Sequence, residues 1–379
     1  MSEELADDDN AIVIDVGSGI IKAGFSDQKT LRAPIPTVLS NVNGKMKIGY
    51  DPLWNDSISS LSYPIEHGVV KNWNDIETIF SHMYHDELKV KSEEHKVLLT
   101  EPIMNPSENK EKLVELMFEN FNVPALQVCC QGLLSLVASG RTTGVVLDSG
   151  DGVTQVTPIY EGRIQSKAIA RINLAGRQLT QNLLIMLNER GYKINSVHAI
   201  ESARCIKEKL CSVAIDYDAL IKDANKASIE KSFELPDGTV IKLDVERFKC
   251  SEILFKPSLA GFEFIPGVHD LLFNSLMNCD CEIQKMLFSN IILNGSSTFF
   301  SGFKERIENE LINRKNDIKV KVISPPERNK SVWIGGSILA SLSSFKNYWL
   351  FKKEYEEYGS NLIYKNSKNF CLQDLINNC

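Results

Sequence analysis

The 379-residue sequence has little of what marks a nucleic-acid-binding, metal-thiolate or membrane-spanning protein. Its 42 basic residues are outnumbered by 49 acidic ones, and a net charge of -7 argues against a surface that wraps nucleic acid. It has only six histidines, and no two of its nine cysteines show CxxC spacing. No apolar run approaches the roughly 20 residues needed to cross a bilayer. These absences favour a globular protein with reduced thiols.

The chain is long and apolar enough to form more than one unit. With 43% hydrophobic residues it can bury a large core, and its length predicts two or more lobes. The first ten residues, MSEELADDDN, contain neither a basic nor a hydrophobic signal region. We therefore expect the protein to stay inside the cell.

Two turns that combine an acid with glycines follow apolar strands. The first is Asp15-Val-Gly-Ser-Gly19, and the second is Asp148-Ser-Gly-Asp-Gly152. A further strand follows each turn, so both segments are predicted to be β-hairpins. Two similar lobes would place these turns opposite each other, with their carboxylates at the bottom of a shared cleft. An internal duplication would explain the repetition.

Such a pair of turns suits the phosphates of a nucleotide. Glycine lets backbone N–H groups approach an anion closely, and Lys22 adds a positive charge. The carboxylates of Asp15 and Asp148 would repel a polyphosphate unless a divalent cation such as Mg²⁺ lies between them. The sequence therefore predicts a site for nucleotide phosphates and their metal.

Other interpretations of the turns fit less well. A Walker loop requires Ser or Thr after Gly-Lys, but the pair Gly44-Lys45 is followed by Met46. A dinucleotide fingerprint requires a third glycine where this chain has Lys22. A single glycine turn is more often a plain hairpin, whereas two turns with matched aspartates favour the phosphate site.

From about Ala11 to Lys365 the sequence resembles the actin family. The similar segments occur in the same order as in that family: YPIEHGVVKNW, LLTEPIMNP, ASGRTTGVVLDSGDGVT, PIYEG, LAGR, ERGY, IKEKLC, ELPDG, PPER and SVWIGGSILASLS. The resemblance implies the two-lobed α/β fold of actin and heat-shock-70 ATPases. It also implies ATP or ADP, with Mg²⁺ or Ca²⁺, in the cleft between the lobes.

The resemblance divides the chain into four parts. Residues 1–36, 65–138 and 331–379 would form a unit like actin subdomain 1, and residues 37–64 a shortened subdomain 2. Residues 139–174 and 264–330 would form subdomain 3, and residues 175–263 would form subdomain 4.

The resemblance also implies roles for individual residues. Asp15 and Asp148 would hold the metal through waters, near Gln131. Gln131 would orient the attacking water, and Gln155 is the second catalytic candidate. The nucleotide would be bound by Gly17, Ser18, Gly19 and Lys22 from the first lobe, and by Asp151, Gly152, Val153, Gly176, Lys207, Glu208, Gly295 and Phe300 from the second.

Some departures from the family pattern affect catalysis and adenine binding. Gln155 stands where actins carry a histidine beside the γ-phosphate, and a glutamine can position water but cannot relay a proton. We therefore expect slow hydrolysis. On the adenine side, Ser296 replaces a glycine, Phe299-Phe300 replaces a Met-Tyr pair, and Asn329 replaces a lysine, so the adenine contacts are expected to differ.

Other departures affect contacts between subunits. The stretch from Pro34 to Tyr63 is polar, contains several prolines and shows little periodicity. Within it, the span from Pro36 to Ser62 is longer in actin, where it carries the loop used for longitudinal contacts. The plug segment SLAGFEFIPGVHD differs from its actin counterpart, and SKNFCLQDLINNC extends past the usual end. Conventional filament formation is therefore not expected.

Two features have two interpretations each. The acidic start resembles the actin terminus that meets myosin, but it also fits an acidic disordered tail. An apolar stripe resembles the cleft where actin-binding proteins insert helices and equally fits core packing. The stripe consists of Ile338, Leu339, Leu342 and Phe345.

Together these observations predict an ATP-binding, actin-like protein of cytoskeletal or related assemblies in the cytoplasm, with slow or lost hydrolysis. The alternative is a non-polymerising subunit of a multiprotein complex, for example a chromatin-associated complex in the nucleus. The expected partners are actin-family subunits or actin-binding proteins, not nucleic acid or membranes. A sugar-kinase-like phosphotransferase is disfavoured because no extra acid stands out as a base for a substrate hydroxyl.

Overall fold

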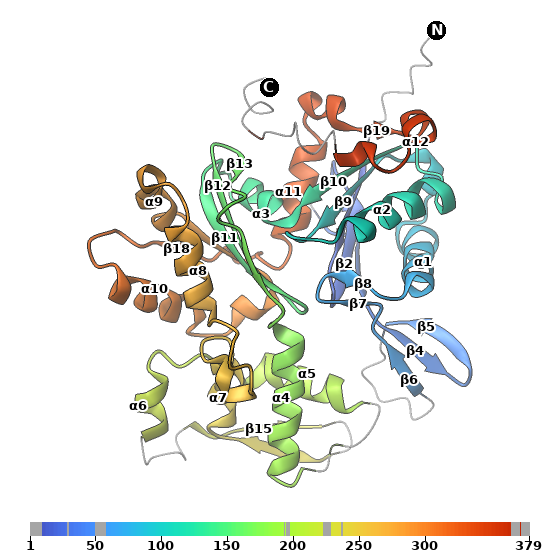
Figure 1. Ribbon diagram of the computed structural model, residues 1–379. Helices are drawn as coiled ribbons and strands as arrows, with labels where there is room; N and C mark the ends of the chain where they lie inside the picture. The colour runs from blue at the N-terminus through green and yellow to red at the C-terminus, as the bar shows by residue number, and fades with distance from the viewer. Residues whose placement is uncertain are drawn as a thin grey trace.

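The computed structural model describes residues 10–28, 30–49, 58–192, 194, 198–222, 229–235, 238–364 and 372. These residues form an α/β structure in which each of two lobes contains a large mixed sheet (Figure 1). The predicted two-lobed α/β fold is therefore confirmed. The acidic start and, except for Leu372, the segment SKNFCLQDLINNC lie outside the described residues.

The first sheet has the strand order β19-β10-β9-β1-β2-β3. Strand β1 is antiparallel to β2 and parallel to β9, and β9 is parallel to β10. All five residues of β1 are buried, with alternate side chains packing into different cores on the two faces of the sheet. The strands are β1 (Ile12–Val16), β2 (Ile20–Phe25), β3 (Ala33–Pro36), β9 (Val97–Glu101), β10 (Ala125–Cys130) and β19 (Leu350–Phe351).

The second sheet repeats this arrangement with the order β13-β12-β11-β17-β18, and β14 pairs with β12. Strand β11 is antiparallel to β12 and parallel to β17, and β17 is parallel to β18. The shared pattern of a hairpin followed by two parallel strands supports the predicted duplication. The strands are β11 (Gly144–Ser149), β12 (Thr154–Tyr160), β13 (Arg163–Ile164), β14 (Ala170–Ile172), β17 (Ile291–Asn294) and β18 (Val322–Ile323).

Helices flank both sheets (Figure 1). Helix α1 begins after Asn72, whose side chain accepts a hydrogen bond from the Asp75 N–H at 3.2 Å. None of the helices among the described residues has the length and apolarity needed to cross a membrane. They are α1 (Trp73–His82), α2 (Ser107–Glu115), α3 (Gln131–Ala138), α4 (Gly176–Glu189), α5 (Ala199–Leu210), α6 (Tyr217–Lys222), α7 (Glu246–Glu252), α8 (Val268–Met277), α9 (Cys281–Phe288), α10 (Phe303–Arg314), α11 (Ser331–Ala340) and α12 (Lys352–Tyr358).

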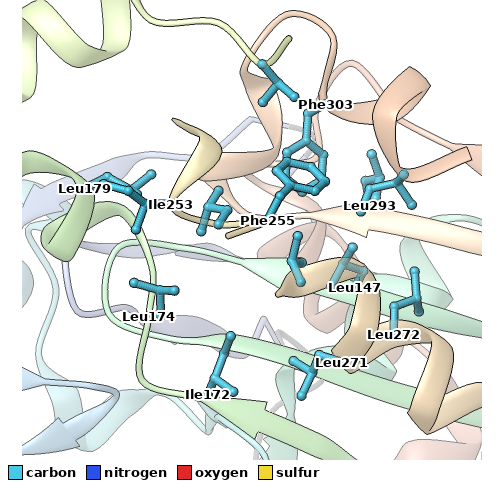
Figure 2. Packing of buried hydrophobic residues seen from close by; sticks show 14 of the residues in the cluster. Leu147, Ile172, Leu174, Leu179, Ile253, Phe255, Leu271, Leu272, Leu293 and Phe303 are labelled. Atoms are coloured by element: carbon cyan, nitrogen blue, oxygen red, sulfur yellow. The ribbon is translucent and has the colours of Figure 1, made fainter. Parts of the chain in front are cut away.

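Three apolar cores stabilise the structure, one in each lobe and one between the lobes. One lies in the second lobe, where Leu147 of β11 and Leu293 of β17 pack with Phe255 and Phe303 (Figure 2). A second core lies on one face of the first sheet, against α1 and α2. The third core contains residues of α3 and α11 together with residues of both sheets, so these two helices join the lobes.

The apolar stripe mostly belongs to this third core. Leu339 and Phe345 are fully buried, Leu342 is half-buried, and only Ile338 is exposed. Core packing therefore accounts for most of the stripe. Only the exposed side chain of Ile338 is accessible to a binding partner.

The region with little periodicity nevertheless contains strands. Strands β4 (Leu39–Val42), β5 (Lys45–Ile48) and β6 (Ile58–Ser62) form a small antiparallel sheet there. Directly after this region, β7 (Ile65–Glu66) pairs with β8 (Val69–Val70). These strands are short, and β5 has three exposed residues out of four, so they carry no clear alternation of apolar and polar residues. In the second lobe, β15 (Lys231–Glu234) pairs with β16 (Val240–Leu243).

Candidate functional site

The β1–β2 and β11–β12 turns meet at a cavity of about 600 Å³. A Cβ atom added to Gly19 would lie 2.9 Å from the Cβ of Asp151, and one added to Gly152 would lie 2.4 Å from Ser18 Oγ. The two turns therefore face each other at close range, as the sequence predicts. There is no room for a side chain at Gly19 or at Gly152.

All of the predicted site residues except Gln155 line this cavity. They come from both lobes and from segments more than 280 residues apart along the chain. The lining includes Asp15, Gly17, Ser18, Gly19, Lys22, Gln131, Asp148, Asp151, Gly152, Val153, Gly176, Lys207, Glu208, Gly295 and Phe300.

Asp15, at the end of β1, is buried and held from several sides. Lys22 Nζ lies 2.9 Å from its Oδ2, and Thr100 Oγ1 donates to its Oδ1 at 3.0 Å. The same Thr100 oxygen accepts a hydrogen bond from the Val16 N–H at 3.0 Å. Gln131 Nε2 donates to Asp15 Oδ1 at 3.3 Å. These contacts hold the carboxylate in one orientation at the cavity.

Asp148 takes the equivalent position at the end of β11. Burial raises the pKa of its carboxyl, and the nearby Asp15 charge raises that pKa further. Hydrogen bonds from Gln155 and Asn294 oppose this effect. Two buried carboxylates at one cavity favour the binding of a cation between them.

Asn294, at the end of β17, adds an oxygen to this group. It is paired in register with Asp148, lines the cavity, and is only 3% exposed. Its Oδ1 has no hydrogen-bond partner among the described residues. Carboxylate and amide oxygens are the ligands that Mg²⁺ and Ca²⁺ prefer, so the residues present fit a hard divalent cation.

The second lobe closes the cavity with the start of α4. The Gly176 N–H donates to Gly150 O at 3.1 Å, which joins α4 to the second turn. The buried Lys207 Nζ donates to Gly176 O at 2.8 Å and to Thr180 Oγ1 at 2.9 Å. Lys207 therefore holds the first turn of α4 in place. The neighbouring Glu208 is exposed.

An aromatic pair, Phe299 and Phe300, also lines the cavity. Phe300 is half-buried, and Phe299 lies under the Arg328 guanidinium, whose Cζ is 3.6 Å from the ring centroid. Arg328 Nε also donates to Thr298 Oγ1 at 2.9 Å. Flat apolar faces beside a fixed cation suit the binding of a planar base.

This geometry agrees with the comparison to known families. The family model named Actin matches residues 6–368. The chain belongs to the actin family. Membership implies ATP binding, since actins in general bind an adenine nucleotide with a divalent cation, and it explains the two duplicated sheets as the fold shared with heat-shock-70 proteins.

Gln155 lies behind the cavity of this actin-family protein. Its Nε2 donates to Gln131 Oε1 at 3.2 Å and to Asp148 Oδ2 at 3.0 Å, and its Oε1 accepts from the Ile103 N–H at 3.0 Å. Both the nitrogen and the oxygen of the Gln155 amide therefore form hydrogen bonds. Gln155 is in a position to orient Gln131, and its side chain is not among those that line the cavity.

Three residues of this site were not identified from the sequence. Thr100, near the end of β9, is part of the family segment LLTEPIMNP, but nothing in that segment indicates its contact with Asp15. Asn294 was detectable in principle, because IILNG repeats the pattern of an apolar strand followed by a polar residue and glycine. Arg177 is part of the family segment LAGR, but its contacts depend on the packing of the two lobes.

Proposed function

We propose that this actin-family protein binds ATP or ADP, with Mg²⁺ or Ca²⁺, in the cavity between the two turns. The strongest support is that two buried carboxylates from separate lobes, Asp15 and Asp148, lie beside two glycine turns. Backbone N–H groups of such turns suit phosphates, and the carboxylates suit the cation that phosphates bring. A ligand that contacts both lobes favours their closed arrangement.

Each part of the cavity has a role in this proposal. Asp15 and Asp148 would hold the cation through waters, with Asn294 as a further oxygen donor. The cation would neutralise negative charge on the phosphates. The phosphates would be bound by Gly17, Ser18, Gly19, Lys22, Asp151, Gly152 and Val153, and the ribose and adenine by Gly176, Lys207, Glu208, Gly295 and Phe300.

Hydrolysis is proposed to be slow or lost. Gln131 would orient the attacking water, and the hydrogen bond from Gln155 would hold Gln131 in place. Both side chains are amides, so neither accepts and passes on a proton at neutral pH. The nucleotide would therefore act mainly as a structural ligand.

We further propose that the protein works in cytoskeletal or related assemblies in the cytoplasm, with actin-family subunits or actin-binding proteins as partners. The four-part division of the chain into subdomains belongs to the same proposal. The alternative is a non-polymerising subunit of a multiprotein complex, which includes nuclear, chromatin-associated complexes. The shortened stretch of residues 37–64 favours this alternative, because in actins it carries a loop for contacts between subunits.

Nucleotide binding is tested by calorimetric titration of the nucleotide-free protein with ATP and Mg²⁺. We expect saturable binding that is lost with EDTA, and slow release of inorganic phosphate in a parallel assay. A folded preparation that retains no nucleotide and shows no heat with any nucleotide would contradict the proposal.

Assembly is tested by sedimentation in polymerising salt at micromolar concentration. Pelleting that depends on ATP would support filament formation, whereas protein that stays in the supernatant would favour the non-polymerising subunit. Affinity isolation of the native protein would then identify its partners.

A further inference from the structure

Leu372 is a buried side chain close to the C-terminal end of the chain. It is only 1% exposed and belongs to the third core, which also contains Phe345 and Trp349. It lies within SKNFCLQDLINNC, residues 367–379, which we call the C-terminal extension. Because the third core contains residues of both sheets, a side chain of the extension is packed where the two lobes join.

The residues that precede the extension are fixed on the opposite face of the first sheet. Ile363 is fully buried in the second core, against α2. Tyr364 OH lies 3.1 Å from Ser107 O and 3.1 Å from Glu111 Oε1, both in α2. Helices α2 and α11 lie on opposite sides of the first sheet (Figure 1). The chain therefore passes from one face of this sheet to the other between Tyr364 and Leu372.

The sequence around Leu372 has the pattern of an amphipathic helix. The spacing i, i+3, i+4 and i+7 joins Leu372, Leu375, Ile376 and Cys379, and the residues between them are polar. Side chains at this spacing share one face of a helix. Segments with one apolar helical face commonly dock in apolar grooves. The extension therefore has the side chains of a ligand for an apolar surface.

Helix α11 presents apolar side chains beside the third core. Ile334 and Leu342 are half-buried and pack against that core, and Ile338 between them is 43% exposed. These three residues, which we call the α11 row, are four positions apart and lie along one side of the helix and its C-terminal end. The α11 row borders the same core that contains Leu372.

We propose that the C-terminal extension is an internal ligand that keeps amphipathic helices of binding partners away from an apolar surface. This surface consists of the α11 row and the adjoining side chains of the third core. Leu372 is the side chain of the extension that the structure shows in place. A partner helix must displace the extension to reach the core side chains. The inference goes beyond the proposed function, because it requires neither bound nucleotide nor assembly.

Attachment to the chain favours the extension over a free helix. Tyr364 is held against α2, and only residues 365–371 lie between it and Leu372. A short linker gives a tethered segment an effective concentration in the millimolar range. A free segment that makes the same contacts with micromolar affinity is therefore excluded until the extension leaves.

The probe is a fluorescein-labelled peptide of residues 366–379, and its binding to the full chain is followed by fluorescence anisotropy in reducing buffer. We expect the original chain to bind the probe weakly, because its own extension occupies the surface. The Leu372→Asp chain should bind the probe at least about 10-fold more tightly, since loss of a buried leucine weakens docking of the extension. Leu372→Met keeps an apolar side chain of similar volume and should exclude the probe as the original chain does.

Two equally exposed isoleucines test where the probe binds. Ile338 of the α11 row is 43% exposed, and Ile312 of α10 is 44% exposed. Because both side chains are exposed, neither substitution removes a core contact. Introduced into the Leu372→Asp chain, Ile338→Asp should weaken probe binding about 10-fold, whereas Ile312→Asp should leave it unchanged.

A cleavable chain provides a second test that does not depend on the stability of Leu372→Asp, which urea unfolding measures. A specific protease site is inserted after Lys365, so that the chain folds with its extension and is cut only afterwards. We expect the cut extension to dissociate on dilution, and the cut chain then to bind the probe as tightly as the Leu372→Asp chain. The uncut chain with the same insertion is the control and should exclude the probe.

Three results would overturn the inference. The first is equal binding of the probe to the original, Leu372→Asp and cut chains, because the extension would then block nothing. The second is a lack of binding to all three, because the extension would then not be a ligand of this surface. The third is an equal loss of binding with Ile338→Asp and Ile312→Asp, because the probe would then bind elsewhere. Calorimetry of the same proteins with ATP and Mg²⁺ tests the proposed function separately.

Discussion

Gln155 Nε2 donates one hydrogen bond to Asp148 Oδ2 at 3.0 Å and another to Gln131 Oε1 at 3.2 Å. One amide therefore connects the carboxylate proposed for the metal to the glutamine proposed to orient water. The contact links two chemical roles through a group that cannot take up a proton.

A histidine at this position should restore the missing proton acceptor. We expect Gln155→His to raise the rate of phosphate release at least about 10-fold, since a well-placed general base contributes roughly 10²–10⁴-fold. Single-turnover hydrolysis of bound ATP measures this rate. Gln155→Leu is the control, because it removes the amide and supplies no base. An unchanged rate in Gln155→His would mean that another group limits hydrolysis.

The buried carboxyl of Asp148 should make the metal-free protein sensitive to pH. Because burial raises its folded-state pKa, the folded chain binds more protons than the unfolded chain between the ordinary and the raised values. The contribution of Asp148 to the free energy of unfolding should therefore increase as pH falls through this window. Asp148→Asn should lose that contribution. Thermal unfolding of both metal-free proteins across acidic pH measures the difference, and parallel curves would contradict it.

The same carboxylate should be needed for the metal. We expect Asp148→Ala to weaken the binding of ATP with Mg²⁺ and to reduce the rise in melting temperature that this ligand causes. The comparison is made with and without EDTA, so that loss of the metal effect is separated from loss of general stability. If the ligand raises the melting temperature of both proteins equally, Asp148 has no role in holding the cation.

Because the two turns approach each other closely, adding one methyl group at Gly152 should be unfavourable. Gly152→Ala would place a Cβ 2.4 Å from Ser18 Oγ, and relief of such overpacking typically costs about 1–3 kcal/mol. We expect nucleotide affinity to fall because the lobes are pushed apart. Gly150→Ala is the matched comparison, since its Cβ would meet no atom within 4 Å. Equal losses in the two variants, measured by calorimetry, would contradict this explanation.

Phe300 should contribute to binding the base. Stacking of a base on an aromatic ring is worth about 1–3 kcal/mol, so Phe300→Ala should weaken ATP binding by about 5- to 150-fold. Phe264→Ala is the control, because Phe264 is 99% exposed and does not line the cavity. Calorimetry with ATP and with inorganic triphosphate separates base binding from phosphate binding. An equal loss with triphosphate would show that the ring does not act through the base.

The sequence predicted much of the fold because its strongest signals are local. The strands IVIDV and GVVLDS are short apolar runs that end in an acid and glycines, and this pattern indicates a buried strand before a turn. Short exposed strands such as β5 carry no such pattern, so the small sheet of β4, β5 and β6 was not apparent.

The candidate site was predictable only in part. The glycines and aspartates of the two turns stand out because few other functions need them together. The partners of Gln155 and the two lobes joined by Arg177 leave no trace in the sequence near those residues, since Arg177 and Ser18 are 159 positions apart.

By itself, the sequence determined the family, the pair of acid–glycine turns and the side chains available for a nucleotide and its metal, because these depend on residue type and local spacing. Only the tertiary structure decided that Gln155 lies behind Gln131, that Asn294 joins the carboxylates, and that Arg177 spans the turns. The physical reason is that these contacts join residues far apart in the sequence. Pairing of β11 with β17 places Asn294 beside Asp148, and the third core, around α3 and α11, packs the two sheets so that the turns meet.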